Sequence, residues 1–348
     1  MKTKTIPNTD ISVSELCLGT MNFGQMCDEA EAHAQLDYAT SHGINFIDTA
    51  EMYPVPPDKT KQGTTERFVG NWLAKTGKRK EIVLASKISS AHQIGSMGTR
   101  AASGLTRENV RAAIDGSLSR LQTDYLDLYQ LHSPDRKANF WGPRGVATID
   151  PSTDGASIEE TLSALTELVK EGKVRAIGLS NETPWGVSEY VRLSREKGLT
   201  RISTIQNQYS LINRTFEVGL SEMCLRENVG LLAYSPLSKG VLSGKYLDGA
   251  LPPDSRFAYS LRDFDRYNPK HAQVAIQKYK EIAEKHNLSL SVLSLAFALE
   301  RSFMTSVILG ARTGAQLIED MSASEHPLSP EILAEIESLY QEYPDPTA

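Results

Sequence analysis

Four side chains that can move or hold a proton stand at the ends of apolar segments of this sequence. In "FIDTAEMYP", Asp48 interrupts a run of β-favouring apolar residues, and Tyr53 follows five positions later. Lys87 lies near the end of "EIVLASKI", and His132 ends "YLDLYQLH". A carboxylate, a phenol, an ammonium and an imidazole in such positions form an acid–base device if the fold brings the segment ends together.

The chemistry of this set follows from its pKa values. A free phenol, with a pKa near 10, is a weak acid at neutral pH, and a nearby cation lowers that pKa by roughly one to three pH units. Lys87 can supply the cation, and Asp48 can hold it charged, because a buried ammonium without a partner is unfavourable. We therefore expect an apparent pKa for Tyr53 below about 10. With His132 hydrogen-bonded to the same oxygen, Tyr53 could turn a carbonyl into a hydroxyl, or the reverse.

The elements that must position these residues alternate between strands and helices. Eight apolar, strand-like segments recur at residues 16–20, 44–49, 81–88, 125–132, 174–180, 203–210, 229–237 and 306–311. Continuous apolar strands separated by helices indicate a parallel sheet that is buried on both faces. Eight of them predict a closed (β/α)8 TIM barrel, with an open doubly wound sheet as the alternative.

Local signals add detail to this barrel. Residues 2–6 and 11–15, around "PNTD", predict an N-terminal β-hairpin. Four helix starts carry a capping residue, the first in a capping box and the others before a proline: Ser157, Thr183, Asn268 and Ser329. The last of these predicts an extra C-terminal helix. We expect residues 1–348 to form a single domain, with 133–156 and 238–267 as inserted loops.

Barrel geometry would gather the four candidate residues, because the chemistry of such barrels sits on the loops that follow the strands. Asp48 and Tyr53 follow the second strand, Lys87 ends the third and His132 ends the fourth. Taken singly, each has an ordinary structural explanation as a cap, a rim aromatic, a solvent-reaching lysine or a buried histidine. Their convergence at neighbouring strand ends favours a catalytic site.

Composition excludes several function classes. The 348 residues are 40% hydrophobic and 23% charged, and the net charge is −6. No cluster of Lys and Arg offers a nucleic-acid surface. The three cysteines lack CxxC spacing, and no apolar run is long enough to span a membrane. We expect a cytoplasmic protein with no metal site and no membrane or nucleic-acid partner.

The motifs resemble those of the aldo-keto reductases. "INFIDTAEMY", "LASKI", "LYQLH", "IGLSN" and "AYSPL" occur in this order at the expected strand ends, and the resemblance covers essentially the whole chain. It is strongest to the bacterial Tas-like NADP(H)-dependent branch, with the channel β-subunit-like branch next. The resemblance implies a nicotinamide cofactor, a small carbonyl substrate and a catalytic tetrad of Asp48, Tyr53, Lys87 and His132, with Tyr53 as the proton donor.

The cofactor site has no nucleotide-binding motif of the usual kinds. G-x-G-x-x-G is absent, so a Rossmann site has no support. "KGVLSGKY" is similar to a P-loop, but Gly244 comes four positions after Gly240 where five are needed, and Tyr246 replaces the required Ser or Thr. The Gly/Ser-rich stretch "YSPLSKGVLSGKY" could instead wrap a pyrophosphate with its backbone N–H groups and with Lys239 or Lys245.

The resemblance also assigns the rest of the cofactor site. Tyr234 would stack under the nicotinamide, while Ser180, Asn181 and Gln206 would hold its carboxamide or merely cap strand ends. Arg312, at a helix start, offers a seat for the 2′-phosphate of NADP(H).

The complete set implied for NADP(H) consists of Thr20, Met21, Ser180, Asn181, Gln206, Tyr234, Ser235, Pro236, Leu237, Ser238, Lys239, Gly240, Val241, Leu242, Ser243, Gly244, Lys245, Arg256, Gly310, Arg312, Gln316 and Glu319. Gln316 and Glu319 would contact the adenine. Arg256 is as easily explained as a solvated loop arginine. Asp320 departs from the amide of the channel-subunit branch, which makes an adenine contact there doubtful.

The substrate side departs from the family pattern. Ser133 stands where many relatives have an aromatic residue, and Trp141 could replace that wall or pack the 133–156 loop onto the barrel. Two other functions remain open: a lyase or aldolase with Lys87 as Schiff-base nucleophile, and a cofactor-sensing binding module with little turnover. The sequence leaves open the substrate, the direction of reaction and whether the protein is a monomer or a homo-oligomer.

Overall fold

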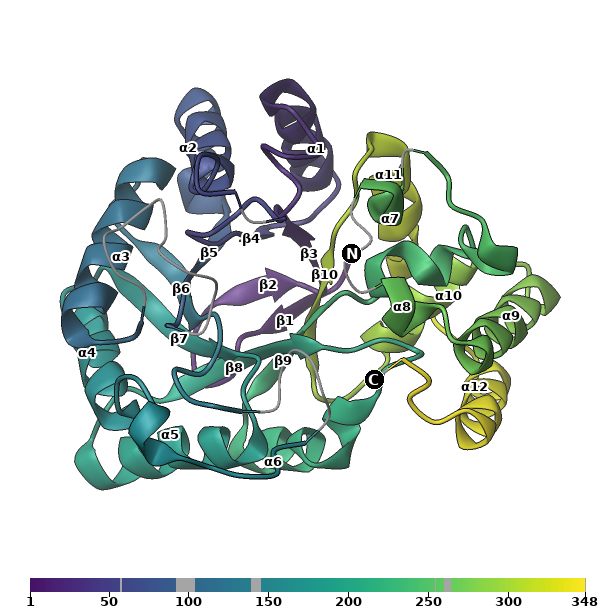
Figure 1. Ribbon diagram of the computed structural model, residues 1–348. Helices are drawn as coiled ribbons and strands as arrows, with labels where there is room; N and C mark the ends of the chain where they lie inside the picture. Colours follow the sequence, from purple (N-terminus) through teal and green to yellow (C-terminus); the bar gives the residue numbers. More distant parts are fainter. Residues whose placement is uncertain (57, 92–103, 139–144, 254, 260–263, 348) are drawn as a thin grey trace.

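Eight parallel strands form a closed barrel in this computed structural model, which describes residues 1–56, 58–91, 104–138, 145–253, 255–259 and 264–347. Each strand pairs with the next along the chain, and the last pairs with the first (Figure 1). The strands are β3 (Leu16–Gly19), β4 (Phe46–Asp48), β5 (Val83–Ile88), β6 (Leu126–Leu131), β7 (Val174–Ser180), β8 (Ile202–Gln208), β9 (Gly230–Tyr234) and β10 (Met304–Leu309). The predicted (β/α)8 barrel is confirmed, and the open-sheet alternative is wrong.

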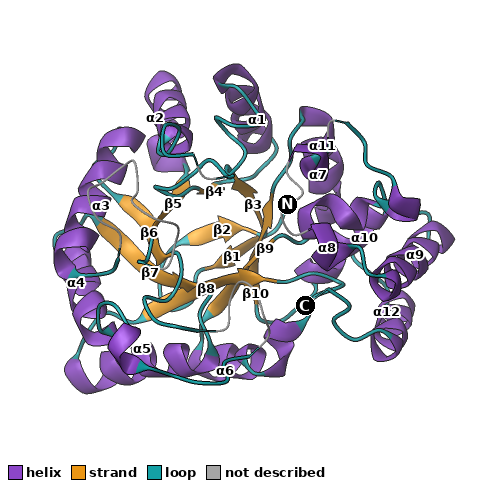
Figure 2. Ribbon diagram, in the orientation of Figure 1, coloured by secondary structure: helices purple, strands orange, loops and turns teal. Residues whose placement is uncertain are grey.

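A ring of helices surrounds the strands (Figure 2). The helices that alternate with the strands are α1 (Glu29–Ser41), α2 (Thr64–Thr76), α3 (Arg107–Leu121), α4 (Ile158–Lys170), α5 (Pro184–Lys197), α6 (Leu220–Glu227), α10 (Leu290–Leu299) and α11 (Gly314–Ser322). Two short helices, α7 (Arg256–Tyr259) and α8 (Phe264–Tyr267), follow β9. Each strand is thereby covered by apolar helix faces, which explains why the strands are apolar throughout.

The predicted helix starts can be compared with the caps. The side chains of Ser157, Thr183 and Ser329 each accept a hydrogen bond from the backbone N–H three residues later, as predicted. The prediction at Asn268 is wrong by one residue, because α9 (Lys270–Lys285) begins after Pro269. With φ −59° and ψ 145°, Pro269 is extended rather than helical, so it stands at the cap position.

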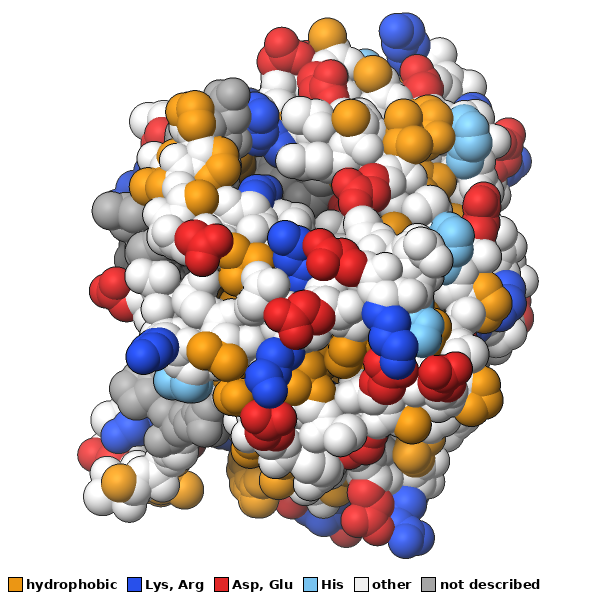
Figure 3. Space-filling view, turned by 90° about the vertical axis from the view of Figure 1, so that its right-hand side faces the viewer, with side chains coloured by type: hydrophobic (Ala, Val, Ile, Leu, Met, Phe, Trp, Pro, Cys, Tyr) orange, Lys and Arg blue, Asp and Glu red, His pale blue; other side chains and the backbone are white. Residues whose placement is uncertain are grey.

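The expected extra C-terminal helix is α12 (Pro330–Glu342), which packs against α9 outside the ring. Lys278 and Lys285 of α9 pair with Glu342 and Glu335 of α12 at 3.1 and 2.8 Å. Figure 3 shows the face on which these two helices lie, with basic and acidic side chains beside one another. Such surface pairs each contribute little, so buried apolar contacts must carry most of the packing.

The N-terminal hairpin closes one end of the barrel. Strands β1 (Thr3–Thr5) and β2 (Ser12–Ser14) pair antiparallel and cross the opening of the ring in Figure 1. Ile6, Ile11 and Val13 are buried against Phe46 and Leu232 inside the barrel. The hairpin fills the end where the strands begin, which leaves the carboxyl ends for a site.

The barrel sheet draws strands from residue 16 to residue 309, which supports the proposal that the chain is one domain. Within the described ranges, no helix is both long and apolar enough to cross a membrane. Trp141 and part of the 133–156 loop lie outside the described residues.

Candidate active site

A cavity of about 510 Å³ opens at the carboxyl ends of the barrel strands. Asp48, Tyr53 and His132 line it, whereas Lys87 lies beneath its floor and is fully buried. The cavity continues to α11, where Arg312, Gln316, Glu319 and Asp320 form its far end. The structure thus brings the four predicted catalytic side chains together at one end of a long channel.

Register in the barrel places Lys87 next to Asp48. Asp48 ends β4 and pairs with Ala85 of β5, and Lys87 lies two residues further along the same face of β5. The Lys87 Nζ donates to Asp48 Oδ2 at 2.5 Å, to the Thr49 carbonyl at 2.9 Å and to the Tyr53 hydroxyl at 3.3 Å. The ammonium therefore bridges the carboxylate and the phenol.

Burial and charge act in opposite directions on these groups. Burial alone would lower the pKa of Lys87, but Asp48 and Tyr53 outweigh it and raise that pKa above its ordinary value, so the ammonium stays charged. Burial raises the pKa of Tyr53 above its ordinary value of 10, although the Lys87 cation opposes it. The expectation of a pKa below 10 for Tyr53 is therefore wrong, because desolvation of the phenolate outweighs the cation.

His132 follows β6 directly and lies beside the phenol. Its ring meets the Tyr53 ring edge-on, with 5.6 Å between centroids and 81° between planes. Burial first, and the Lys87 cation second, lower the pKa of His132 well below 6.5. The imidazole is neutral at physiological pH, so it can donate a single N–H to an oxygen in the cavity while Tyr53 keeps its own proton.

The three predicted carboxamide residues border the cavity and already have partners. Ser180 donates to the backbone carbonyl of Gln206 at 2.7 Å, and Asn181 donates to the backbone carbonyl of His132 at 2.8 Å. The Tyr234 hydroxyl donates to Asn181 Oδ1 at 2.7 Å. Both interpretations of these residues remain compatible, since the same side chains tie strand ends together and face the cavity.

The loop after β9 meets the cavity with only part of its length. Lys239 and Gly240 have φ of 60° and 89°, and this left-handed stretch turns the chain. Of the predicted residues in this loop, those that line the cavity are Ser235, Pro236, Leu237, Lys239, Gly240, Ser243 and Lys245. Outside the loop, the predicted Thr20, Met21 and Gly310 line it too. Ser238, Val241, Leu242 and Gly244 are outside the lining; Ser238 is buried, with its hydroxyl 2.9 Å from that of Ser210.

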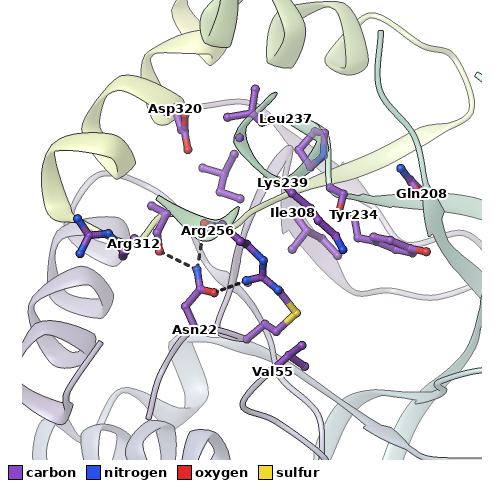
Figure 4. Close-up of a pocket in the computed structure, with 18 of the residues that line it drawn as sticks. Asn22, Val55, Gln208, Tyr234, Leu237, Lys239, Arg256, Ile308, Arg312 and Asp320 are labelled. Carbon is purple, nitrogen blue, oxygen red and sulfur yellow. Dashed lines mark hydrogen bonds between the residues drawn. The ribbon is translucent and has the colours of Figure 1, made fainter. Parts of the chain in front are cut away.

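Figure 4 shows how Arg256 reaches across the channel to the loop after β3. Its Nη1 donates to Asn22 Oδ1 at 3.0 Å, and the Asn22 amide donates to the Gly310 carbonyl at 3.1 Å. Three acidic side chains line the cavity, against five cationic ones, which are Lys239, Lys245, Arg256, Arg266 and Arg312. In a chain with a net charge of −6, this concentration suits a ligand with several phosphates.

Sequence reasoning missed several cavity residues. Met52, Val55 and Pro56 stand beside Tyr53 in the same loop, and their closeness in sequence was an available signal. Asn22 follows the predicted Thr20 and Met21 directly. Arg266 comes from the segment predicted as an inserted loop, where no motif marks it.

The predicted effect of Ser133, the loss of a large apolar wall beside the substrate, stays a prediction. Ser133 is fully buried, and its hydroxyl lies 2.6 Å from that of Ser90. It is absent from the cavity lining.

Comparison with known proteins gives matches along nearly the whole chain. Residues 15–341 match the model of the Aldo/keto reductase family. The chain is 48% identical over 346 residues to protein tas of Escherichia coli (strain K12), covering 99% of each. It is 31% identical over 333 residues to the uncharacterized oxidoreductase YrpG of Bacillus subtilis (strain 168), covering 95% of this chain and 94% of that one. It is 30% identical over 340 residues to norsolorinic acid reductase A of Aspergillus parasiticus, covering 95% and 79%.

Asp320 gives a prediction about pH and stability. Burial, and to a lesser extent Glu319, raise the pKa of Asp320 to about 7, while Lys245 opposes them. Between pH 3.8 and about 7, the folded carboxyl keeps a proton that the unfolded chain has released, so stability falls as pH rises through this window. Asp320→Asn should raise the melting temperature more at pH 8 than at pH 5. At pH 8, the free energy of unfolding should increase by at most about 4 kcal/mol.

Thermal unfolding of both proteins at the two pH values measures this effect. Asp10→Asn is the matched control at the surface, because that side chain is 89% exposed. An equal gain at pH 5 and pH 8 for Asp320→Asn would contradict the assignment.

Proposed function

The chain belongs to the aldo/keto reductase family and is an oxidoreductase, and from this we propose that it transfers hydride between NADP(H) and the carbonyl carbon of an aldehyde or ketone. Tyr53 is the proton donor, assisted by Lys87, Asp48 and His132. The observation that carries the proposal is the Lys87 ammonium, buried between Asp48 at 2.5 Å and the Tyr53 hydroxyl at 3.3 Å. This arrangement serves a proton transfer at an oxygen in the cavity.

The proton donor works through two neighbours. Tyr53 stays protonated at neutral pH because burial raises its pKa, so the donor is present before substrate arrives. As Tyr53 gives its proton to the carbonyl oxygen, the Lys87 cation stabilises the phenolate that forms. The neutral His132 can donate a hydrogen bond to the same oxygen and so hold it near the phenol.

The other half of the channel suits the cofactor. NADPH, when bound, supplies the hydride. Tyr234, at the end of β9, offers an aromatic face, and the cations Lys239, Lys245 and Arg256 line the channel. Arg312 precedes α11, where the helix N-terminus adds to its attraction for a phosphate.

The same geometry argues against one of the two alternative functions. A Schiff-base lysine must be neutral to attack a carbonyl, whereas Asp48 and Tyr53 raise the pKa of Lys87. A binding module with little turnover could keep the same four residues, so turnover of a simple aldehyde with NADPH separates the two functions.

The surroundings of Tyr53 and the cysteines suggest two further properties. Met21, Met52 and Val55 pack around Tyr53, which favours a substrate with an apolar group beside its carbonyl. The free, buried cysteines favour a reducing compartment such as the cytoplasm.

Tyr53→Phe tests the assignment of the proton donor. Loss of general-acid catalysis should lower kcat for 4-nitrobenzaldehyde with NADPH by about 10² to 10⁴. The Kd for NADPH should change less than about twofold, because the phenol oxygen faces the substrate. In the wild type, kcat should fall on the alkaline side only above about pH 10, because burial raises the pKa of Tyr53.

Steady-state kinetics and NADPH titrations of both proteins give these quantities. Tyr279→Phe is the control, since the hydroxyl of Tyr279 in α9 is buried and has no hydrogen-bond partner among the described residues. If Tyr53→Phe kept more than about a tenth of the wild-type kcat, the proton would come from another group.

Arg312→Ala tests the choice of cofactor. A charge-assisted hydrogen bond to a phosphate contributes about 1.5–3 kcal/mol, so the Kd for NADPH should rise roughly 10- to 100-fold while the Kd for NADH hardly changes. Fluorescence titration with both cofactors measures this, and Arg226→Ala on the surface of α6 is the control. Equal affinity of the wild type for NADPH and NADH would refute the assignment of Arg312.

A further inference from the structure

At the floor of the cavity, Asp48 belongs to a closed ring of hydrogen bonds with two glutamines. Asp48 Oδ1 accepts from Gln130 Nε2 at 3.0 Å and from Gln206 Nε2 at 2.9 Å. Gln206 Nε2 also donates to Gln130 Oε1 at 3.0 Å. Asp48 Oδ2 remains for the ammonium of Lys87, so the two carboxylate oxygens have separate partners.

The ring fixes the orientation of both amides. An ionised carboxylate only accepts hydrogen bonds, so each glutamine must turn its NH2 group toward Asp48. Gln206 then uses both N–H groups inside the ring, one on Asp48 and one on Gln130. Because Gln206 also lines the cavity, its side-chain oxygen Oε1 is the group left to bind a ligand. This oxygen can accept a hydrogen bond from the N–H of a carboxamide.

The barrel makes room for Gln130. This side chain is fully buried, and its strand β6 is otherwise mostly apolar, so the amide is tolerated only because it is paired. Gly178 stands opposite Gln130 in the register of β6 and β7, and a Cβ at Gly178 would lie 3.3 Å from Gln130 Cγ and 2.3 Å from Thr204 Oγ1. The glycine leaves the space through which β6 and β8 exchange hydrogen bonds.

We propose that Gln130 is a positioning residue that links the carboxamide-binding Gln206 to the proton donor, through Asp48 and Lys87. This inference rests on the proposed reductase function. Gln130 holds Asp48 Oδ1 so that Oδ2 faces the ammonium, and the ammonium in turn faces Tyr53. When the side-chain oxygen of Gln206 accepts a hydrogen bond from a carboxamide, the side-chain N–H groups of Gln206 become better donors. They then bind Asp48 and Gln130 more tightly. Binding of the cofactor would thereby fix Asp48 and Lys87 in the orientation that Tyr53 needs as proton donor.

Gln130→Met tests this role, because Met has a similar length and no amide. Loss of a hydrogen bond to the charged Asp48 should lower kcat about 10- to 100-fold. The KM for 4-nitrobenzaldehyde should change little. A second readout separates positioning from packing: the alkaline limb of kcat, which Tyr53 sets, should move to higher pH, because a Lys87 ammonium that is held less firmly lowers the pKa of Tyr53 less.

Gln130→Glu provides a rescue. A protonated Glu can donate its O–H to Asp48 and accept from Gln206, which restores the ring, whereas an ionised Glu repels Asp48. From pH 8 to pH 6, kcat of this variant should rise relative to that of Gln130→Met. Thr204→Val is the control: Thr204 is buried in β8, and its hydroxyl has no partner among the described residues, so kcat should stay within about twofold of wild type.

The outcomes distinguish a failure of the positioning role from a failure of the proposed function. If the wild type is active, and Gln130→Met keeps the wild-type kcat and an unmoved alkaline limb, the positioning role alone is overturned. The same holds if Gln130→Glu follows Gln130→Met at every pH. A wild type that binds NADPH but reduces no aldehyde or ketone would overturn the proposed function and this inference with it.

Discussion

A lysine ammonium without solvent contact has to be stabilised by the protein itself, and in this barrel the carboxylate of Asp48 does so. Lys87 is fully buried, and its Nζ lies 2.5 Å from Asp48 Oδ2. Removing one partner of such a pair costs about 3–5 kcal/mol, because the other charge is left uncompensated. The order of β4 and β5 in the barrel, the end of β4 at Asp48 and the two glutamines on Asp48 Oδ1 all support this one contact.

The same burial decides how Tyr53 can act. Desolvation raises the pKa of the phenol more than the cation lowers it, so Tyr53 is a donor that remains loaded at neutral pH. Lys87 matters when the phenol gives up its proton, because a cation at 3.3 Å from the hydroxyl stabilises the phenolate at a buried position. Burial keeps the proton in place, and the ion pair makes its transfer possible.

The sequence predicted what depends on strand order. Alternating apolar segments and polar strand ends determine a barrel, and the barrel places the ends of β4, β5 and β6 side by side. What it could not predict depends on burial and on contacts across strands. The pKa of Tyr53 is set by how completely several loops cover it. The ring through Gln130 needs the register of β6, β7 and β8, and the left-handed turn at Lys239 and Gly240 decides which loop residues meet the cavity.

The central claim is that the Lys87 ammonium makes Tyr53 an effective acid, and hydride transfer in a single turnover of Lys87→Met tests it most directly. NADPH oxidation should slow by at least about 100-fold, the lower end of general-acid contributions, while NADPH still binds with a Kd within about threefold of wild type, which shows a folded protein. Lys285→Met, on the surface of α9, should react like the wild type. A Lys87→Met protein that binds NADPH and transfers hydride at close to the wild-type rate would contradict the account.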